Sequence, residues 1–226
     1  MPTCFEAIHP ALSKCGIYVR GCSSTLRINH RTTEEIRKHA IALLKGISSD
    51  DLDKGSDPGE KCRSRTHGEK PIIRNFNNAN DEFDFLLDEI RKLKAKGVAL
   101  TDICVAARTK KLVDDYIALF TRAGIRSYGI KRNKADERSF DGLRVAMMHR
   151  VKGLEFKCVF VAAVNNRIIP LLAAIRKTDS ISEAESLTSE KCLLYVAMTR
   201  GQKGVYRTSY GRKSEFLSEN LAWSSR

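Results

Sequence analysis

Four charged side chains and one glycine separate two apolar runs between Val145 and Val161, in the segment VAMMHRVKGLEFKCVFV. The apolar runs have the β-prone composition of strands buried in a sheet. The interruption, HRVKGLE, offers a histidine, two cations and a carboxylate, which bind polar ligands through hydrogen bonds and charge. Gly153 would let the backbone turn there. We therefore interpret residues 149–155 as a loop at the end of a strand, lifted out of the core to meet a ligand.

The chain is strongly basic. Its 226 residues carry 40 Lys and Arg against 27 Asp and Glu, a net charge of +13. Such an excess favours a polyanionic partner, nucleic acid above all, although a basic protein with solvated faces has the same balance. No run approaches the ~18 apolar residues of a membrane span, so we expect no membrane partner. Seven scattered cysteines without a CxxC pair favour reduced thiols in the cytoplasm and predict no metal site.

Strand and helix patterns alternate along the chain. Strands are predicted at 71–76, 102–108, 125–130, 143–148, 158–164 and 205–210. Helices are predicted at 34–44, 81–96, 111–123, 183–198 and 214–221. This alternation predicts an α/β fold, a mostly parallel sheet with helices on both faces, whose ligands sit beyond the carboxyl ends of the strands. The polar, glycine-rich stretch 48–71 is expected to be an exposed loop.

Four segments together resemble the UvrD/Rep-type superfamily 1 DNA helicases. LRINHRTTEEI resembles motif IV, MMHRVKGLEFKCVFV motif V and KCLLYVAMTRGQKGVYRTS motif VI, and ICVAARTKKLVDDYIALFTRAGI resembles the strand and helix between motifs IV and V. The matches follow the family's order from Leu26 to Thr208. The resemblance implies that residues 23–226 are the second RecA-like motor domain. ATP would then lie in the cleft to the first motor domain, with single-stranded DNA across the other face.

The resemblance also assigns residues to the nucleotide. Arg31 of NHR and Arg200 of MTR match the two arginines that reach the γ-phosphate from this domain, and they are the predicted catalytic pair. Glu155 of KGLE matches the carboxylate that holds the ribose. His30 stands where the family usually has the tyrosine that stacks on the adenine. Arginine suits the phosphate role because its planar, permanently charged fork pairs with phosphate oxygens.

Further residues are assigned by the resemblance to the DNA track, or to coupling between nucleotide and DNA. They are Arg108, Thr109, Lys110, His149, Lys152 and Gly153. The first three lie where the family's R-T-N segment touches DNA, and Lys110 replaces the asparagine, which exchanges a hydrogen-bonding amide for a phosphate-type contact.

Plainer interpretations exist for several of these side chains. Arg200 could simply close a helix, where a cation complements the helix dipole. Glu155 could merely pair with Lys152 or Lys157. Lys110 could be a solvated lysine at the start of a helix.

No P-loop of the form G-x-x-x-x-G-K-[ST] and no Walker B run occurs in the sequence. The resemblance therefore implies that ATP and Mg²⁺ are bound mainly by an N-terminal P-loop domain of the same, longer protein, and that this chain alone is inactive. Residues 1–22 would be a remnant of the preceding segment, and 131–141 a short connection in place of the family's accessory domain. The hypothesis is an ATP-dependent DNA helicase; the alternative is a non-catalytic nucleic-acid-binding or interaction module derived from one.

Overall fold

A six-stranded parallel sheet forms the centre of the computed structural model, which describes residues 28–44, 62–131, 136–137 and 139–217. The strand order is β3-β8-β7-β4-β6-β5, and every neighbouring pair is parallel. The strands are β3 (Ile72–Phe76), β4 (Ile103–Ala107), β5 (Ser127–Gly129), β6 (Leu143–Met147), β7 (Phe156–Val161) and β8 (Gly201–Tyr210). The parallel sheet confirms the predicted fold class.

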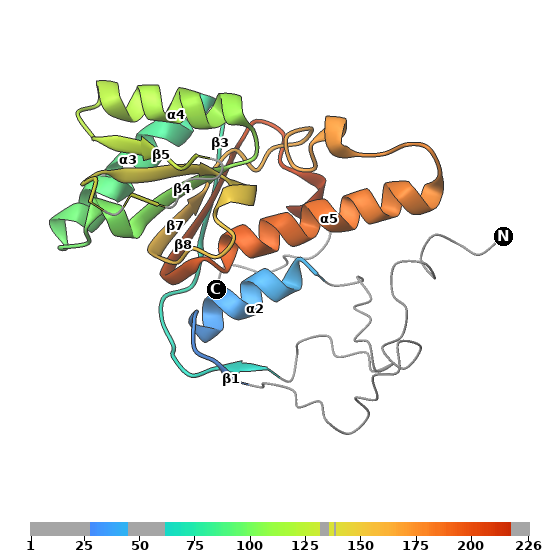
Figure 1. Ribbon diagram of the computed structural model, residues 1–226, viewed down its shortest axis with the longest axis horizontal. Helices are drawn as coiled ribbons and strands as arrows, with labels where there is room; N and C mark the ends of the chain where they lie inside the picture. The colour runs from blue at the N-terminus through green and yellow to red at the C-terminus, as the bar shows by residue number, and fades with distance from the viewer. Residues whose placement is uncertain (1–27, 45–61, 132–135, 138, 218–226) are drawn as a thin grey trace.

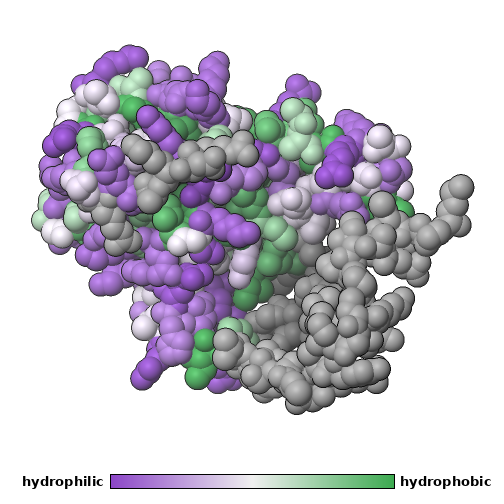
Figure 2. Space-filling view, viewed as in Figure 1, coloured by the Kyte–Doolittle hydropathy of each residue, from purple (hydrophilic) through white to green (hydrophobic). Residues whose placement is uncertain are grey.

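Helices cover both faces of this sheet (Figure 1). One face packs against α3 (Ala79–Ala95) and α4 (Lys110–Arg122), the other against α2 (Glu34–Ala42) and α5 (Ser180–Met198). Four 3₁₀ turns complete the described elements: η2 (Leu100–Asp102), η3 (Met148–Arg150), η4 (Leu172–Ala174) and η5 (Glu215–Leu217). Because both faces are covered, the central strands β4 and β7 are almost wholly buried, which explains their near-continuous apolar sequence. The surface over α3 and α4 is mainly hydrophilic (Figure 2).

The helices begin and end where the sequence supplies caps. Asn78 accepts hydrogen bonds from the amides of Asn80 and Asp81 at the start of α3, and Gly97 (φ +82°) follows its end. In the same way, Gly124 (φ +78°) follows α4. At both positions the left-handed backbone favours glycine, so the helix boundaries could be read from the sequence.

The end of the predicted polar loop is a structured part of the fold. Arg63–Ser64 forms strand β2, parallel to β1 (Ile28–Asn29), and Ser64 is buried. The Ser64 amide donates to the Glu34 carboxylate over 2.7 Å, which holds β2 against the start of α2. Ser64 therefore differs from the predicted exposed loop, whereas Arg63 and residues 65–70 are exposed. Residues 48–61 and the predicted remnant 1–22 lie outside the described residues.

The segment between β6 and β7 is a crossover that runs the length of the sheet. Met147 pairs with Ala107 of β4, whereas Val161, at the end of β7, pairs with Ala106. The ends of β6 and β7 are therefore level, and residues 148–155 must return about 20 Å to the start of β7. Val151 anchors this return in the core, and Gly153 turns with φ +86°.

This crossover corrects one prediction. His149 lies at the carboxyl edge of the sheet, but Glu155 lies at its amino edge, so residues 149–155 are not one loop at one strand end. The physical reason is the strand order: β6 and β7 are parallel with β4 between them, so their connection must span the strands.

A fully buried arginine holds the short connection between β5 and β6. Arg144 donates to the Asp136 carboxylate over 2.8 Å, and to the carbonyls of Glu137, Phe140 and Gly142 over 2.7–2.8 Å. Five N–H donors in a fixed fork suit this arrangement, because one side chain can bond several carbonyls of the connection and a carboxylate at the same time. The described part of residues 131–141 is thus packed tightly onto β6.

Candidate functional site

Three segments that are distant in sequence meet at the amino edge of the sheet. The Nε of Arg31 donates to Oε1 of Glu155 over 2.5 Å, and Nε2 of Gln202 donates to the other carboxylate oxygen over 3.0 Å. The backbone amide of Phe156 donates to the carbonyl of Arg200 over 3.0 Å, so Glu155 is held next to the end of α5. Arg31, Glu155, Arg200 and Gln202 are called the amino-edge cluster below.

The position of Arg31 is set by the turn between β1 and α2. The Arg31 amide donates to Oδ1 of Asn29 over 2.8 Å, and Nδ2 of Asn29 donates to Oγ1 of Thr32 over 2.9 Å. Thr33 then caps α2. An asparagine that bonds the backbone two residues on fixes such a turn without a helix or strand. The Arg31 side chain itself remains 45% exposed.

The two arginines of this cluster differ in their surroundings. Arg200 is only 9% exposed, and its Nε donates to the carbonyl of Val196 in the last turn of α5 over 3.1 Å. Burial lowers the pKa of Arg200, the like charge of Arg31 lowers it further, and Glu155 opposes both. Arg31 and then Gln202 hold the pKa of Glu155 below its usual value, so this carboxylate is ionised near neutral pH. Arg200 is therefore fixed, whereas Arg31 is held by one solvent-exposed ion pair.

The plainer interpretations of Glu155 and Arg200 can be compared with the contacts of these side chains. Glu155 pairs with Arg31 rather than with Lys152 or Lys157; Lys152 is exposed and Lys157 pairs with Asp102 over 2.8 Å. That interpretation of Glu155 is wrong. The hydrogen bond from Arg200 to the last turn of α5 agrees with a helix-closing role, and the burial of Arg200 beside Arg31 and Glu155 goes beyond it. His30 is exposed, next to Arg31 in the chain.

A second group of assigned residues lies at the carboxyl edge. Arg108 follows β4 and forms a buried bidentate ion pair with Glu190 of α5, with N–O distances of 2.6 and 2.9 Å. Glu190 also accepts the Leu171 amide over 3.0 Å. Burial acts to raise the pKa of Glu190, but Arg108 and the Leu171 amide outweigh it, so the net shift is downward. The Arg108 guanidinium faces the protein, with 8% of the side chain exposed.

The neighbours of Arg108 are more open to solvent. His149 is exposed at the carboxyl end of β6, and partial burial and then the charge of Arg108 lower its pKa, so its ring is neutral near pH 7. Thr109 caps α4 by accepting the Leu112 amide over 3.3 Å. Lys110 is exposed and lies 3.6 Å from Asp114. A direct contact of these side chains with DNA stays a prediction.

Two elements connect the edges. The crossover carries His149 at the carboxyl edge and Glu155 at the amino edge. Helix α5 carries Glu190 at the carboxyl edge and ends beside Arg200, about 15 Å away at 1.5 Å per residue. Helix α5 also packs on η3 in the crossover. A movement of side chains at one edge can therefore reach the other edge through the crossover or through α5.

Sequence reasoning missed Gln202 and Glu190. The last strand was predicted to begin at residue 205, but β8 begins at Gly201, and this brings Gln202 beside β7 and Glu155. Glu190 is one of several acidic residues in α5, and no local pattern marks it as the partner of Arg108. Only the strand order brings these pairs together.

The fold is a parallel α/β domain of the RecA type, and arginines and a carboxylate cluster at one edge of its sheet. These two features together define the class of protein. The UvrD-like helicase C-terminal domain model matches residues 24–140 and 125–211. The chain belongs to the family of UvrD-like helicase C-terminal domains. The crystal structure of the C-terminal domain of a possible DNA helicase from Lactobacillus plantarum WCFS1 has a similar fold, with a TM-score of 0.60 and 15% identity over 86% of this chain and 95% of that one.

Curated relatives agree with this family. The chain is 34% identical over 122 residues to YjcD of Bacillus subtilis strain 168, covering 53% of this chain and 15% of YjcD. It is 32% identical over 108 residues to the ATP-dependent DNA helicase Rep of Buchnera aphidicola (41% of this chain, 15% of Rep). It is 32% identical over 90 residues to the ATP-dependent DNA helicase PcrA of Staphylococcus epidermidis (35% of this chain, 12% of PcrA). The matches thus span only 12–15% of each relative's length.

No helix in the described ranges is long and apolar enough to cross a membrane. Within the same ranges, no group of three or more His, Cys, Asp and Glu side chains is arranged to hold a metal ion.

Proposed function

We propose that this chain is the C-terminal motor domain of an ATP-dependent DNA helicase or translocase. In this proposal, Arg31 and Arg200 act on ATP and Mg²⁺ that are held mainly by an N-terminal P-loop domain of the same longer protein, and the carboxyl edge forms part of a single-stranded DNA track. The observation that carries the proposal is the meeting of Arg31, Glu155 and Arg200 at the amino edge.

The amino-edge cluster suits a nucleotide chemically. The charges of Arg31 and Arg200 act on one another, and Glu155 is the carboxylate that acts on both, which leaves an excess positive charge for a triphosphate. Glu155 is ionised and can accept hydrogen bonds from ribose hydroxyls. Arginines that approach a transferring phosphoryl group stabilise the charge of its transition state, which can be worth ~10³–10⁵ in rate.

The unequal anchoring of the two arginines gives them different tasks. The buried Arg200 is preorganised by the Val196 carbonyl and needs little rearrangement to meet a phosphate. Arg31 must leave Glu155 to do so. That exposed ion pair is worth only about 0–1 kcal/mol, less than a charge-assisted contact to phosphate. Release of Arg31 frees Oε1 of Glu155 at the same time, while Gln202 stays on the other carboxylate oxygen, so Arg31 and Oε1 become available together.

The two edges provide the coupling that a motor requires. The DNA track is assigned to the carboxyl edge, around Lys110 and His149, while the nucleotide lies at the amino edge. The crossover and α5 join these edges through packed, hydrogen-bonded contacts. A change of partner at Glu155 or Arg200 is thereby transmitted to His149 and Glu190, which supports a DNA response to the nucleotide state.

The test combines the chain with the P-loop domain that precedes it in the longer protein. The chain alone should not hydrolyse ATP, and the combined protein should do so with stimulation by an oligothymidylate. Salt-sensitive binding of DNA by the combined protein with no hydrolysis would favour the non-catalytic module and contradict the motor. Absence of any in-frame P-loop domain upstream of Met1 in the genome would contradict it as well.

A further inference from the structure

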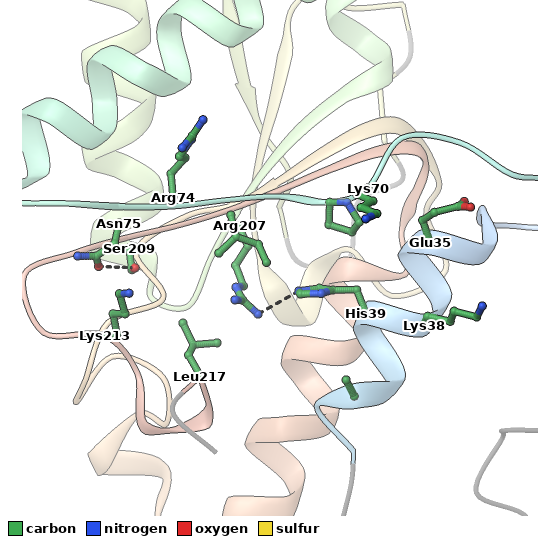
Figure 3. Close-up of a pocket in the computed structure, with 13 residues that line it drawn as sticks. Glu35, Lys38, His39, Lys70, Arg74, Asn75, Arg207, Ser209, Lys213 and Leu217 are labelled. Carbon is green, nitrogen blue, oxygen red and sulfur yellow. Dashed lines mark hydrogen bonds between the residues drawn. The ribbon is translucent and has the colours of Figure 1, made fainter. Parts of the chain in front are cut away.

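A basic pocket of about 540 Å³ lies between α2, β3 and β8 (Figure 3), and its lining includes none of the residues described above at the two edges of the sheet. We call it the α2–β3 pocket. Cationic side chains and one histidine dominate its lining: Lys38, His39, Lys70, Arg74, Arg207 and Lys213. They come from four separate stretches of chain, so only the tertiary fold gathers them. Neither the nucleotide nor the DNA assignment uses any of these residues.

A buried arginine without a carboxylate partner lies at the centre of the pocket. Arg207 is 3% exposed, its Nη1 lies 3.2 Å from Nε2 of His39, and its Nε has no hydrogen-bond partner. In the described part of the chain, no carboxylate lies within ion-pair distance of it. Burial lowers the pKa of Arg207 to about 10, so it is still charged at neutral pH. An uncompensated buried cation is costly and calls for a counter-ion.

The neighbours of Arg207 do not neutralise it. Burial first, and then the charge of Arg207, lower the pKa of His39 to about 4, so at neutral pH the ring is uncharged and can accept the Arg207 N–H. Among the described residues, Glu35 is the one acid that lines the pocket. Its carboxylate is already engaged, by His67 at 3.0 Å and by the Gly68 amide at 2.8 Å. Lys38 pairs with Glu34 over 3.7 Å, and the Arg74 side chain points away from Arg207 (Figure 3), so the positive charge inside the pocket is mainly that of Arg207.

We propose that the α2–β3 pocket binds a phosphate group, with Arg207 as its central contact and Lys213 at its rim. Guanidinium groups pair with phosphate oxygens through two parallel hydrogen bonds, and Lys213 adds charge. The volume exceeds that of a phosphate alone and is within the range of small-molecule sites. Ile73, which is 42% exposed, and Leu217 provide an apolar surface for an organic group attached to the phosphate. The phosphate can belong to a free phosphorylated compound or to the backbone of a nucleic acid strand.

The test is a set of calorimetric titrations of the 226-residue chain with inorganic phosphate, AMP, a dodecathymidylate and acetate. The amino-edge cluster could also bind the phosphate probes, so all titrations are run in an Arg200→Ala background. We expect phosphate and AMP to bind this protein, and Arg207→Met to weaken both at least tenfold. Because Arg207 is buried, Lys213→Glu provides an exposed variant that should weaken binding severalfold, while Lys94→Glu on α3 makes the same charge change elsewhere and should leave binding unchanged. Thermal unfolding checks that each variant is folded.

The probes separate the two sources of phosphate. Tighter binding of the oligonucleotide than of AMP supports a nucleic acid strand, provided that the slope of log K against log salt falls by about 0.7 for each cation removed from the pocket. Equal or tighter binding of AMP supports a free phosphorylated compound. The proposal is overturned if folded Arg207→Met and Lys213→Glu both bind as the parent does, if no phosphate probe binds, or if acetate binds as tightly as phosphate.

Discussion

Arg31 and Glu155 lie 124 residues apart in sequence, and their side chains meet at 2.5 Å. Arg31 comes from the turn between β1 and α2, whereas Glu155 ends the crossover that leads into β7. This contact therefore joins the first described segment of the chain to the element that spans the sheet. It holds one arginine of the amino-edge cluster beside the other, at the place where we propose that ATP is bound.

Replacement of Glu155 by glutamine tests the proposed ribose contact. In the longer helicase, Glu155→Gln should raise KM for ATP roughly tenfold with little change in kcat, because a ribose contact is made equally in the ground and transition states. The measurement is steady-state ATP hydrolysis at saturating DNA. Lys157→Gln, on an exposed neighbour that pairs with Asp102, is the control and should change neither constant. A lower kcat at unchanged KM would contradict the ribose role.

The buried pair of Arg108 and Glu190 should be important for stability. Glu190→Gln leaves the Arg108 charge buried without its partner, which costs about 3–5 kcal/mol in the free energy of unfolding. The double variant Arg108→Met, Glu190→Leu should recover much of that loss, since neither charge then remains buried. Urea titrations followed by circular dichroism measure both. Equal stability of Glu190→Gln and the parent chain would show that the pair contributes nothing.

The same double variant decides whether Arg108 touches DNA. Because the guanidinium faces Glu190, we expect the slope of log K against log salt for oligothymidylate binding to be unchanged in it. Lys110→Ala should lower that slope by about 0.7, the value for one phosphate contact to a single strand. A slope reduced by removal of Arg108 and unaffected by removal of Lys110 would reverse these roles.

Acid should weaken the attachment of β2 to α2 through Glu34. The hydrogen bond from Arg37, and also the Ser64 amide, lower the pKa of Glu34 from 4.5 to about 2, and its side chain is 9% exposed. A carboxyl group whose pKa is depressed by folding stabilises the protein above its unfolded pKa, and this contribution is lost as the pH falls from about 4.5 to 2. Glu34→Gln should lose about 3 kcal/mol at pH 6 and far less near pH 2.5, by urea unfolding. If the difference in free energy of unfolding between Glu34→Gln and the parent did not change with pH, the lowered pKa of Glu34 would be contradicted.

The sequence predicted the elements well because their signals are local. The glycines that follow α3 and α4 and the apolar runs of β4 and β7 can each be read from a few adjacent residues, whereas the first residues of α3 and α4 lie slightly before the predicted starts at 81 and 111. The motif residues Arg31, Glu155 and Arg200 were identified from a resemblance, and the structure brings them to one edge.

The sequence did not predict what depends on strand order. The placement of β4 between β6 and β7 turns the segment from His149 to Glu155 into a crossover, and nothing within that segment encodes the order. The pairing of Arg108 with Glu190 and the gathering of cations around Arg207 depend in the same way on contacts between distant segments. The role of a buried charge depends on its partner, and the partner comes from a distant segment that only the folded structure brings close.

The rate of ATP hydrolysis by an Arg200→Ala variant tests the central claim most directly. In the longer helicase, with single-stranded DNA present, the variant should lose about 10³–10⁵ in kcat because Arg200 stabilises the charge of the transferring phosphoryl group. Lys203→Ala, which removes an exposed cation three residues further along, should keep the parent rate. Hydrolysis by folded Arg200→Ala at the parent rate would contradict the assignment of the amino-edge cluster to ATP.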